Sequence, residues 1–323
     1  MSMYNAIINS TKQFAFESKI ENKDKLKNFR KFILVGMGGS HLAGDLLKLI
    51  KPELDILIHS NYSLPNIASS DLKERLIILN SYSGNTEETI DAYNETLKLG
   101  LATIVISIGG KLLEKAIENK TPYIKMPNFN IQPRSALPLN LISILKAVGE
   151  EETLSEIEKL AETFSPDNFE KKGKKLAETL RGYIPIIYAS DKNTTLAYNW
   201  KIKFNETGKI PAFYNVLPEL NHNEMTGYDV IDATRALSEK FCFIFLTDKD
   251  DHPKTRNRMI VTKKLYEERN LKTIQIEITG ENIFHKIFNN LALADFTAYY
   301  TAENYGLESE QVPMVEEFKK LIE

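Results

Sequence analysis

The sequence has one cysteine, one tryptophan and almost no excess of charge. A single cysteine excludes an internal disulfide and a thiolate metal cluster. Cys242 stands inside the apolar run 241–246, which predicts an inert thiol in the core. The formal net charge of −3 provides no basic field for nucleic acid or for an anionic membrane. The densest basic run, 171–175, is therefore interpreted as a solvated helix face.

Long apolar segments are also missing. No stretch reaches membrane-spanning length, and the N-terminus lacks a signal-peptide pattern. We therefore expect no membrane partner and a cytoplasmic location. With 323 residues, 42% of them hydrophobic and 26% charged, the chain is long enough for two globular domains.

Strand and helix patterns alternate along the chain. Short apolar runs predict strands at 32–35, 55–59, 75–79, 102–107, 123–126, 185–189, 241–246 and 273–278. Helical patterns lie between most of them, so the fold class is α/β, with two mainly parallel sheets flanked by helices on both faces. The charged helical stretch 150–180 predicts a connector between domains 1–150 and 151–323. The polar segment 1–27 predicts a surface helix and linker.

The turn after the third predicted strand carries three hydroxyl groups in six residues, those of Ser81, Ser83 and Thr86, beside the flexible Gly84. A helix pattern follows, and the start of a helix presents backbone N–H groups that have no partner within the helix. Uncharged hydroxyl and N–H donors together suit a phosphate monoester. Ordinary helix capping by Thr86 is the alternative.

A glycine turn follows the first predicted strand, with Gly38, Gly39 and Ser40 leading into a helix. It resembles a dinucleotide fingerprint but fails it, because the third glycine position is His41. What remains is a turn where backbone approaches a ligand closely. His41 is interpreted as a turn residue at the rim of the pocket. In parallel sheets, ligands lie beyond the carboxyl ends of strands, where both turns are expected.

Three further polar segments are candidates. Arg134 stands between two prolines that stiffen its loop, so its guanidinium could clamp an oxyanion, although a surface ion pair is the commoner role of an arginine. Glu206 and His222 occur in loops rich in proline, glycine and asparagine, and such a pair is typical of proton transfer. A helix end and an ordinary loop histidine are the alternatives. The acidic run 248–252 fits no calcium loop and is interpreted as a solvated loop.

Taken together, these segments resemble the bifunctional phosphoglucose/phosphomannose isomerase family, built from two sugar-isomerase (SIS) domains. The resemblance runs from about residue 30 to the C-terminus and rests on the stretches 36–41, 80–86, 133–135, 205–206, 211–213 and 219–224. The hydroxyl turn (residues 81–86) alone occurs in any SIS domain, whereas the Glu206 and His222 segments are specific to the isomerase branch.

The resemblance implies a role for each candidate. Gly38, Gly39, Ser40, Ser81, Ser83 and Thr86 would bind the sugar phosphate. Glu206 would move a proton between C2 and C1, and Arg134 would stabilise the enediolate. His222 would assist ring opening, reaching the pocket from the other subunit of a homodimer. Lys319 is the best match to a lysine of the C-terminal helix, with Lys320 adjacent.

The implied reaction is a metal-independent aldose–ketose isomerisation of glucose 6-phosphate or mannose 6-phosphate with fructose 6-phosphate, without a cofactor. It requires the hydroxyl turn and Glu206 to face one cleft. Two alternatives remain: a non-catalytic SIS protein that binds a sugar phosphate, and another SIS enzyme that acts on amino-sugar phosphates. Two segments depart from the family pattern, Thr207-Gly208 after the glutamate and the sequence 307–310 near the C-terminus. These departures leave details of the substrate pocket open.

Overall fold

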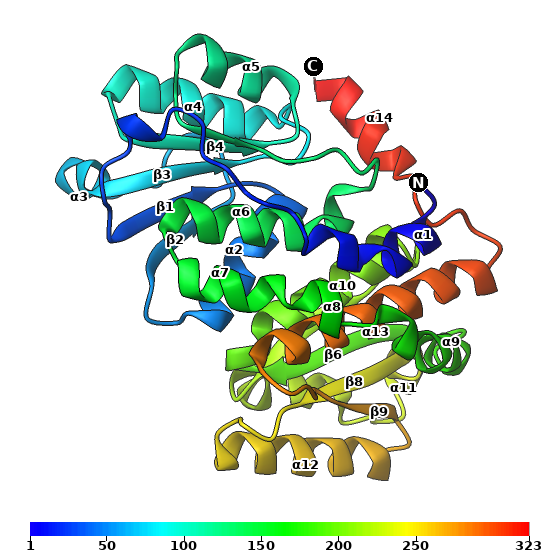
Figure 1. Cartoon of the computed structure of the whole chain (residues 1–323). Helices are drawn as coiled ribbons and strands as arrows, with labels where there is room; N and C mark the ends of the chain where they lie inside the picture. Colours follow the sequence, from blue (N-terminus) through cyan, green and yellow to red (C-terminus); the bar gives the residue numbers. More distant parts are fainter. Residues whose placement is uncertain (323) are drawn as a thin grey trace. The chain divides into compact units, whose positions relative to one another are not determined.

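The computed structural model describes residues 1–322 and divides into two compact units (Figure 1). The N-terminal unit comprises Ile8–Phe164 with Met1, and the C-terminal unit comprises Ser2–Ile7 and the chain from Ser165 onward. Each unit is built on its own sheet of parallel strands. The predicted α/β class with two parallel sheets is confirmed.

The sheet of the N-terminal unit has five strands in the order β2-β1-β3-β4-β5. They are β1 (Lys31–Val35), β2 (Asp55–His59), β3 (Arg75–Asn80), β4 (Thr103–Ser107) and β5 (Tyr123–Lys125). Strands β1 and β3 are parallel neighbours, with Val35 in register with Leu79. The chain therefore changes direction across the sheet between β1 and β3, the place where open α/β sheets form ligand crevices.

Helices cover both faces of this sheet. Helix α2 (Gly39–Ile50) packs against α6 (Leu137–Val148) on one face, and α4 (Glu87–Leu99) and α5 (Gly110–Glu118) lie against β3 and β4. Successive residues of β1 are buried on both sides, which explains the continuous apolar run of the sequence. The shorter helices α3 (Ser69–Glu74), α7 (Glu151–Glu158) and α8 (Leu160–Thr163) complete the unit.

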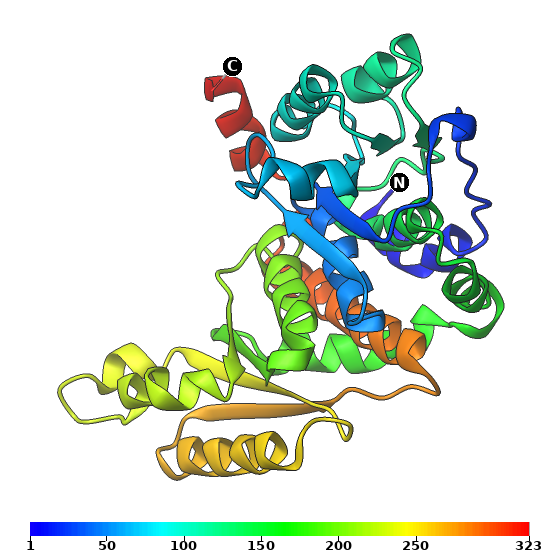
Figure 2. The same ribbon diagram turned by 90° about the vertical axis from the view of Figure 1, so that its left-hand side faces the viewer.

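The C-terminal unit has four parallel strands in the order β7-β6-β8-β9. They are β6 (Ile184–Ser190), β7 (Phe213–Leu217), β8 (Phe241–Thr247) and β9 (Lys272–Glu277). Helices α10 (Thr194–Glu206), α13 (Ile283–Asn304) and α9 (Glu170–Thr179) pack together, whereas α12 (Pro253–Glu268) lies along β8 and β9 (Figure 2). Helix α11 (Arg235–Ser238) is short, and α14 (Pro313–Ile322) is the last element.

The helix predicted at the start of the chain is present, but one face of it is buried. Helix α1 (Met3–Ile8) buries Met3 and Ile7, and the ring of Tyr4 makes edge-on and tilted contacts with rings of α13. Phe14 is fully buried, with its ring centroid 6.1 Å from that of Phe164. The partners are more than a hundred positions away in the chain, so the local polar pattern could not show this burial.

Two smaller predictions are confirmed. The lysines of 171–175 are exposed along α9. Cys242 is fully buried in β8, and burial raises the pKa of its thiol to about 12. Across residues 1–322, no helix is long and apolar enough to cross a membrane.

Candidate active site

The turns after β1 and β3 are joined side by side in the N-terminal unit. The backbone N–H of Tyr82 donates to Ser40 Oγ at 3.0 Å, and the buried Asn80 amide donates to the Ser40 carbonyl at 2.8 Å. Ser40 itself is buried, with 4% of its surface exposed. The structure thus brings the predicted glycine turn and hydroxyl turn into one continuous loop surface.

The hydroxyl turn has its own internal bonds. Ser81 Oγ lies 2.8 Å from Thr86 Oγ1 and accepts the backbone N–H of Gly84 at 3.1 Å. Ser83 is exposed, and its Oγ accepts the N–H of Asn85 at 3.2 Å. Thr86 stands at the N-cap of α4, yet its side chain makes no capping hydrogen bond. The capping alternative therefore does not account for its hydroxyl, which points to Ser81 instead.

Two glycines allow the backbone segments of this surface to touch. Gly84 has φ +72°, and a Cβ there would lie 1.8 Å from the Gly109 carbonyl oxygen. A Cβ on Gly39 would lie 2.5 Å from the carbonyl oxygen of Pro133. The second approach sets the glycine turn directly against the segment that carries Arg134, so only glycine fits at position 39.

Arg134 occupies a single 3-10 turn, η3 (Pro133–Ser135), and is only 4% exposed. Gln13 fixes the end of that turn by donating its side-chain amide to the Ser135 carbonyl at 2.9 Å. Arg134 is therefore not a surface side chain, and a guanidinium held in a fixed turn suits a rigid cationic clamp.

His41 lies in the first turn of α2 rather than in the preceding loop, so its interpretation as a turn residue is wrong. Its Nε2 is 3.4 Å from Asp45 Oδ2, one turn further along the helix. Burial raises the pKa of the Asp45 carboxyl group, although His41 and Lys48 oppose that effect. Helix α2 begins at Gly39, directly after Gly38, whose positive φ of +52° lies outside the helix.

Glu206 is the last residue of α10 and is half-buried. The helix end is closed because the N–H groups of Thr207 and Gly208 both donate to the Lys203 carbonyl, at 2.9 and 3.0 Å. Lys209, which has φ +59°, donates its ammonium group to the Glu206 carbonyl at 2.7 Å and to the carbonyl of Gln311. Sequence reasoning missed Lys209, whose positive φ and backbone contacts have no signature in the sequence.

His222 lies at the end of a 3-10 turn, η6 (Glu219–His222), and is exposed. The segment before it is not the continuous loop that its composition predicted, because 213–217 form the edge strand β7. The ring of Tyr214 packs on Tyr198 of α10 at a centroid distance of 5.2 Å. Lys319 is exposed on α14 and pairs with Glu316 at 2.8 Å.

The acidic run after β8 is only in part a solvated loop. Asp248 and Asp251 are 2% and 4% exposed. Lys286 donates to Asp248 at 2.7 Å, and Ser190 donates to Asp251 at 2.6 Å. These partners come from α13 and from the end of β6, and they bury the two aspartates, whereas Lys249, Asp250 and His252 of the same run are exposed as predicted. Within residues 1–322, no cluster of three or more His, Cys, Asp or Glu side chains could hold a metal ion.

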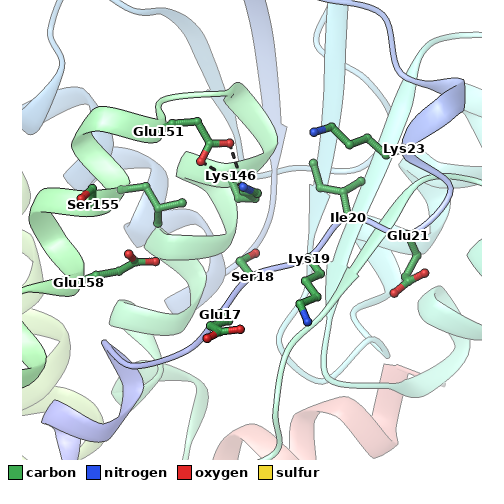
Figure 3. Close-up of a pocket in the computed structure, with 11 residues that line it drawn as sticks. Glu17, Ser18, Lys19, Ile20, Glu21, Lys23, Lys146, Glu151, Ser155 and Glu158 are labelled. Carbon is green, nitrogen blue, oxygen red and sulfur yellow. Dashed lines mark hydrogen bonds and ion pairs between the residues drawn. The ribbon is translucent and has the colours of Figure 1, made fainter.

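A cavity of about 620 Å³ lies elsewhere on the N-terminal unit, between the segment 17–23 and the helices α6 and α7 (Figure 3). Lysine and glutamate side chains dominate its wall, and Lys146 pairs with Glu151 at 2.8 Å. None of the predicted site residues lines this cavity. Because no residue of the hydroxyl turn or the glycine turn lines it, we place the candidate site at the turns after β1 and β3.

Comparisons with known proteins show what the whole chain is similar to. A family model described as the bacterial phospho-glucose isomerase C-terminal SIS domain matches residues 169–322. A bifunctional phosphoglucose/phosphomannose isomerase of Caldicellulosiruptor bescii is 31% identical over 98% of this chain and 97% of its own length. A protein of the same name from Aquifex aeolicus is 29% identical over 94% and 95%. The crystal structure of a hypothetical protein from Thermus thermophilus shares the fold, with a TM-score of 0.73 at 14% identity, over 99% of this chain and 88% of that one.

Proposed function

The chain belongs to the bifunctional phosphoglucose/phosphomannose isomerase family, and we propose that it interconverts glucose 6-phosphate and mannose 6-phosphate with fructose 6-phosphate. The observation that carries the proposal is the pair of hydroxyl groups of Ser81 and Thr86 at the start of α4, which are not used to cap the helix. They offer uncharged donors beside helix N–H groups, a combination that suits a phosphate monoester.

The phosphate group would anchor the substrate in the N-terminal unit. Ser83 adds an exposed hydroxyl at the same turn, and Gly38, Gly39 and Ser40 contribute the neighbouring backbone. Anchoring through the unreactive phosphate supplies binding energy that holds C1 and C2 in place for the proton transfer. Because this anchor is uncharged, Arg134 is left for the negative charge that develops on the enediolate.

In the C-terminal unit, Glu206 would act as the base that shuttles one proton between C2 and C1. The backbone of Glu206 is fixed because hydrogen bonds close the end of α10 directly after it. The side chain of Glu206 is only half-buried and remains accessible to a substrate. The exposed His222 would assist ring opening from the second subunit of a homodimer, and Lys319 would be the lysine that the family uses in its C-terminal helix. We expect the enzyme to work in the cytoplasm.

A coupled assay tests the proposal. The purified chain is supplied in turn with glucose 6-phosphate, mannose 6-phosphate and glucosamine 6-phosphate, each with and without a chelator. We expect formation of fructose 6-phosphate from the first two sugars, at rates that the chelator does not change. Activity on glucosamine 6-phosphate alone would favour an amino-sugar enzyme, and tight binding without turnover would favour a non-catalytic sugar-phosphate protein.

A further inference from the structure

The loop that carries His222 is tied to the C-terminal unit on both sides of the histidine. Before it, Leu220 is fully buried, and Asn221 donates to Thr262 Oγ1 of α12 at 2.9 Å. Arg258 of the same helix donates to Asn221 Oδ1 at 3.3 Å. After it, the next turn, η7 (Glu224–Tyr228), begins with a carboxylate that points back to the sheet.

Glu224 binds two neighbouring strands at once. Tyr188 of β6 donates its hydroxyl to Glu224 Oε1, and Asn215 of β7 donates its amide to Glu224 Oε2. Tyr188 and Asn215 are register partners, so both reach the same side of the sheet. The Val216 N–H donates to Asn215 Oδ1 at 2.8 Å, which fixes the orientation of that amide with its NH₂ group toward Glu224.

The tyrosine at the base of this contact is rigid and remains a donor. Tyr188 is fully buried, its ring centroid lies 5.5 Å from that of Phe243, and its hydroxyl lies 3.3 Å from that of Tyr266. Burial, with smaller effects of Tyr266 and Glu224, raises the pKa of the Tyr188 hydroxyl. A protonated, immobile phenol beside an oriented amide gives Glu224 one well-defined position.

We propose that Glu224 is a positioning residue, which holds the loop so that His222 is presented at a fixed place for ring opening. The inference rests on the proposed function for the role of His222, but the anchoring itself does not. Glu224 is two residues beyond His222, so at most about 7 Å of chain separates their Cα atoms and a shift of the anchor reaches the histidine. Displacements of about 1 Å in a site can cost on the order of 10²-fold in rate.

A charge swap tests the anchor. Glu224→Gln leaves a single acceptor for the two donors Tyr188 and Asn215, whereas in Asn215→Asp two carboxylates face each other. The double variant restores one donor and one acceptor, and the carboxylate introduced at position 215 still accepts the Val216 N–H. We expect each single variant to lower kcat on glucose 6-phosphate by about 10-fold or more, and the double variant to recover to within about threefold of the parent. The exposed Glu268→Gln on α12 is the matched control and should leave kcat unchanged.

A double-mutant cycle shows whether the effect passes through His222. In a His222→Ala background, Glu224→Gln should lower kcat by less than about twofold further, because the residue that it positions is already gone. An equal loss in both backgrounds would overturn the proposal, and so would single variants with the kcat of the parent.

Hydrogen exchange of the amides at 219–225 provides a readout that needs no activity. We expect faster exchange in Glu224→Gln and a return to the parental rate in the double variant. If the parent protein has no isomerase activity, the proposed function fails, while this measurement still decides whether Glu224 anchors the loop. Unchanged exchange in all three variants would refute the anchor even in an active isomerase.

Discussion

Ser81 and Thr86 place their hydroxyl oxygens 2.8 Å apart across the turn between β3 and α4. The two residues differ in their other contacts, because Ser81 is buried and also accepts the Gly84 N–H, whereas Thr86 is half-buried at the helix start. Ser83 stands between them and is exposed. Binding of phosphate and stability of the turn can therefore be separated by mutation.

Replacing Ser83 by alanine removes an exposed hydroxyl without breaking the Ser81–Thr86 contact. We expect KM for glucose 6-phosphate to rise several-fold with kcat nearly unchanged, because a phosphate contact is equally strong in the ground state and the transition state. Ser81→Ala should raise KM and also lower the melting temperature, since the contact with Thr86 is lost and the Gly84 N–H keeps only the Ser81 carbonyl as acceptor. Steady-state kinetics and thermal unfolding measure both effects, with the exposed Ser70→Ala as control. An unchanged KM in both variants would count against a phosphate site here.

Gly84 should be intolerant of substitution. Gly84 and Gly100 both have positive φ, +72° and +64°, but a Cβ on Gly84 meets the Gly109 carbonyl at 1.8 Å, whereas nothing lies within 4 Å of one on Gly100. Gly100→Ala should lower the free energy of unfolding by only about 1 kcal/mol, the cost of the left-handed conformation. Gly84→Ala should cost well over ~2 kcal/mol, because the neighbouring backbone must also move. Denaturant titration of both variants compares them directly, and equal losses would contradict the close approach.

Much of the sheet architecture could be predicted because its central strands are buried on both faces. The residues of β3, for example, are buried without exception, and the strand reads as an apolar run. Strand β7 was not predicted because it lies at an edge of the sheet, where Phe213 and Tyr214 are exposed and Asn215 is polar. A polar edge strand has no such run, so its composition looks like a loop.

Contacts between distant segments explain which polar residues of the C-terminal unit could not be placed from the sequence. The residues of the hydroxyl turn are close in the chain, so their pattern could be recognised. By contrast, Glu224 acquires its place from Tyr188, and Asp251 from Ser190, which lie 36 and 61 positions away. Neither partner has a local signature that indicates the contact.

Glu206 should be indispensable for turnover. Glu206→Gln keeps the size of the side chain and the backbone hydrogen bonds of the helix end but cannot accept a proton. We expect kcat to fall by at least ~10²-fold, the scale for loss of a general base. Glu178→Gln, which alters an exposed glutamate of α9, provides the control. Turnover close to that of the parent would remove Glu206 from its proposed role.

The buried aspartates of the C-terminal unit predict a specific dependence of stability on pH. Burial acts to raise the pKa of Asp248, but the hydrogen bonds from Lys286 and from the Asp250 backbone, together with the charge of Lys192, outweigh it and lower that pKa. Asp248 therefore contributes to stability at pH values above 3.8, the usual pKa of an aspartate. This contribution is lost as the pH falls through the lower pKa that Asp248 has in the folded protein. Burial raises the pKa of Asp251, because the hydrogen bond from Ser190 only partly compensates. The stabilising contribution of Asp251 is present at pH values below 3.8 and is lost as the pH rises through the raised pKa that Asp251 has in the folded protein.

The two aspartates should consequently respond in opposite ways to replacement by asparagine. Asp251→Asn retains an acceptor for Ser190 and cannot ionise, so the free energy of unfolding at pH 7 should equal or exceed that of the parent, with a flatter profile above about pH 4. Asp248→Asn deprives the buried Lys286 of its closest buried partner and should cost on the order of 3 kcal/mol at pH 7. Denaturant titrations across this pH range measure both variants. If Asp251→Asn were less stable than Asp248→Asn, the fold would require the ionised form of Asp251. The inference that the charge of Asp251 is unfavourable would then be wrong.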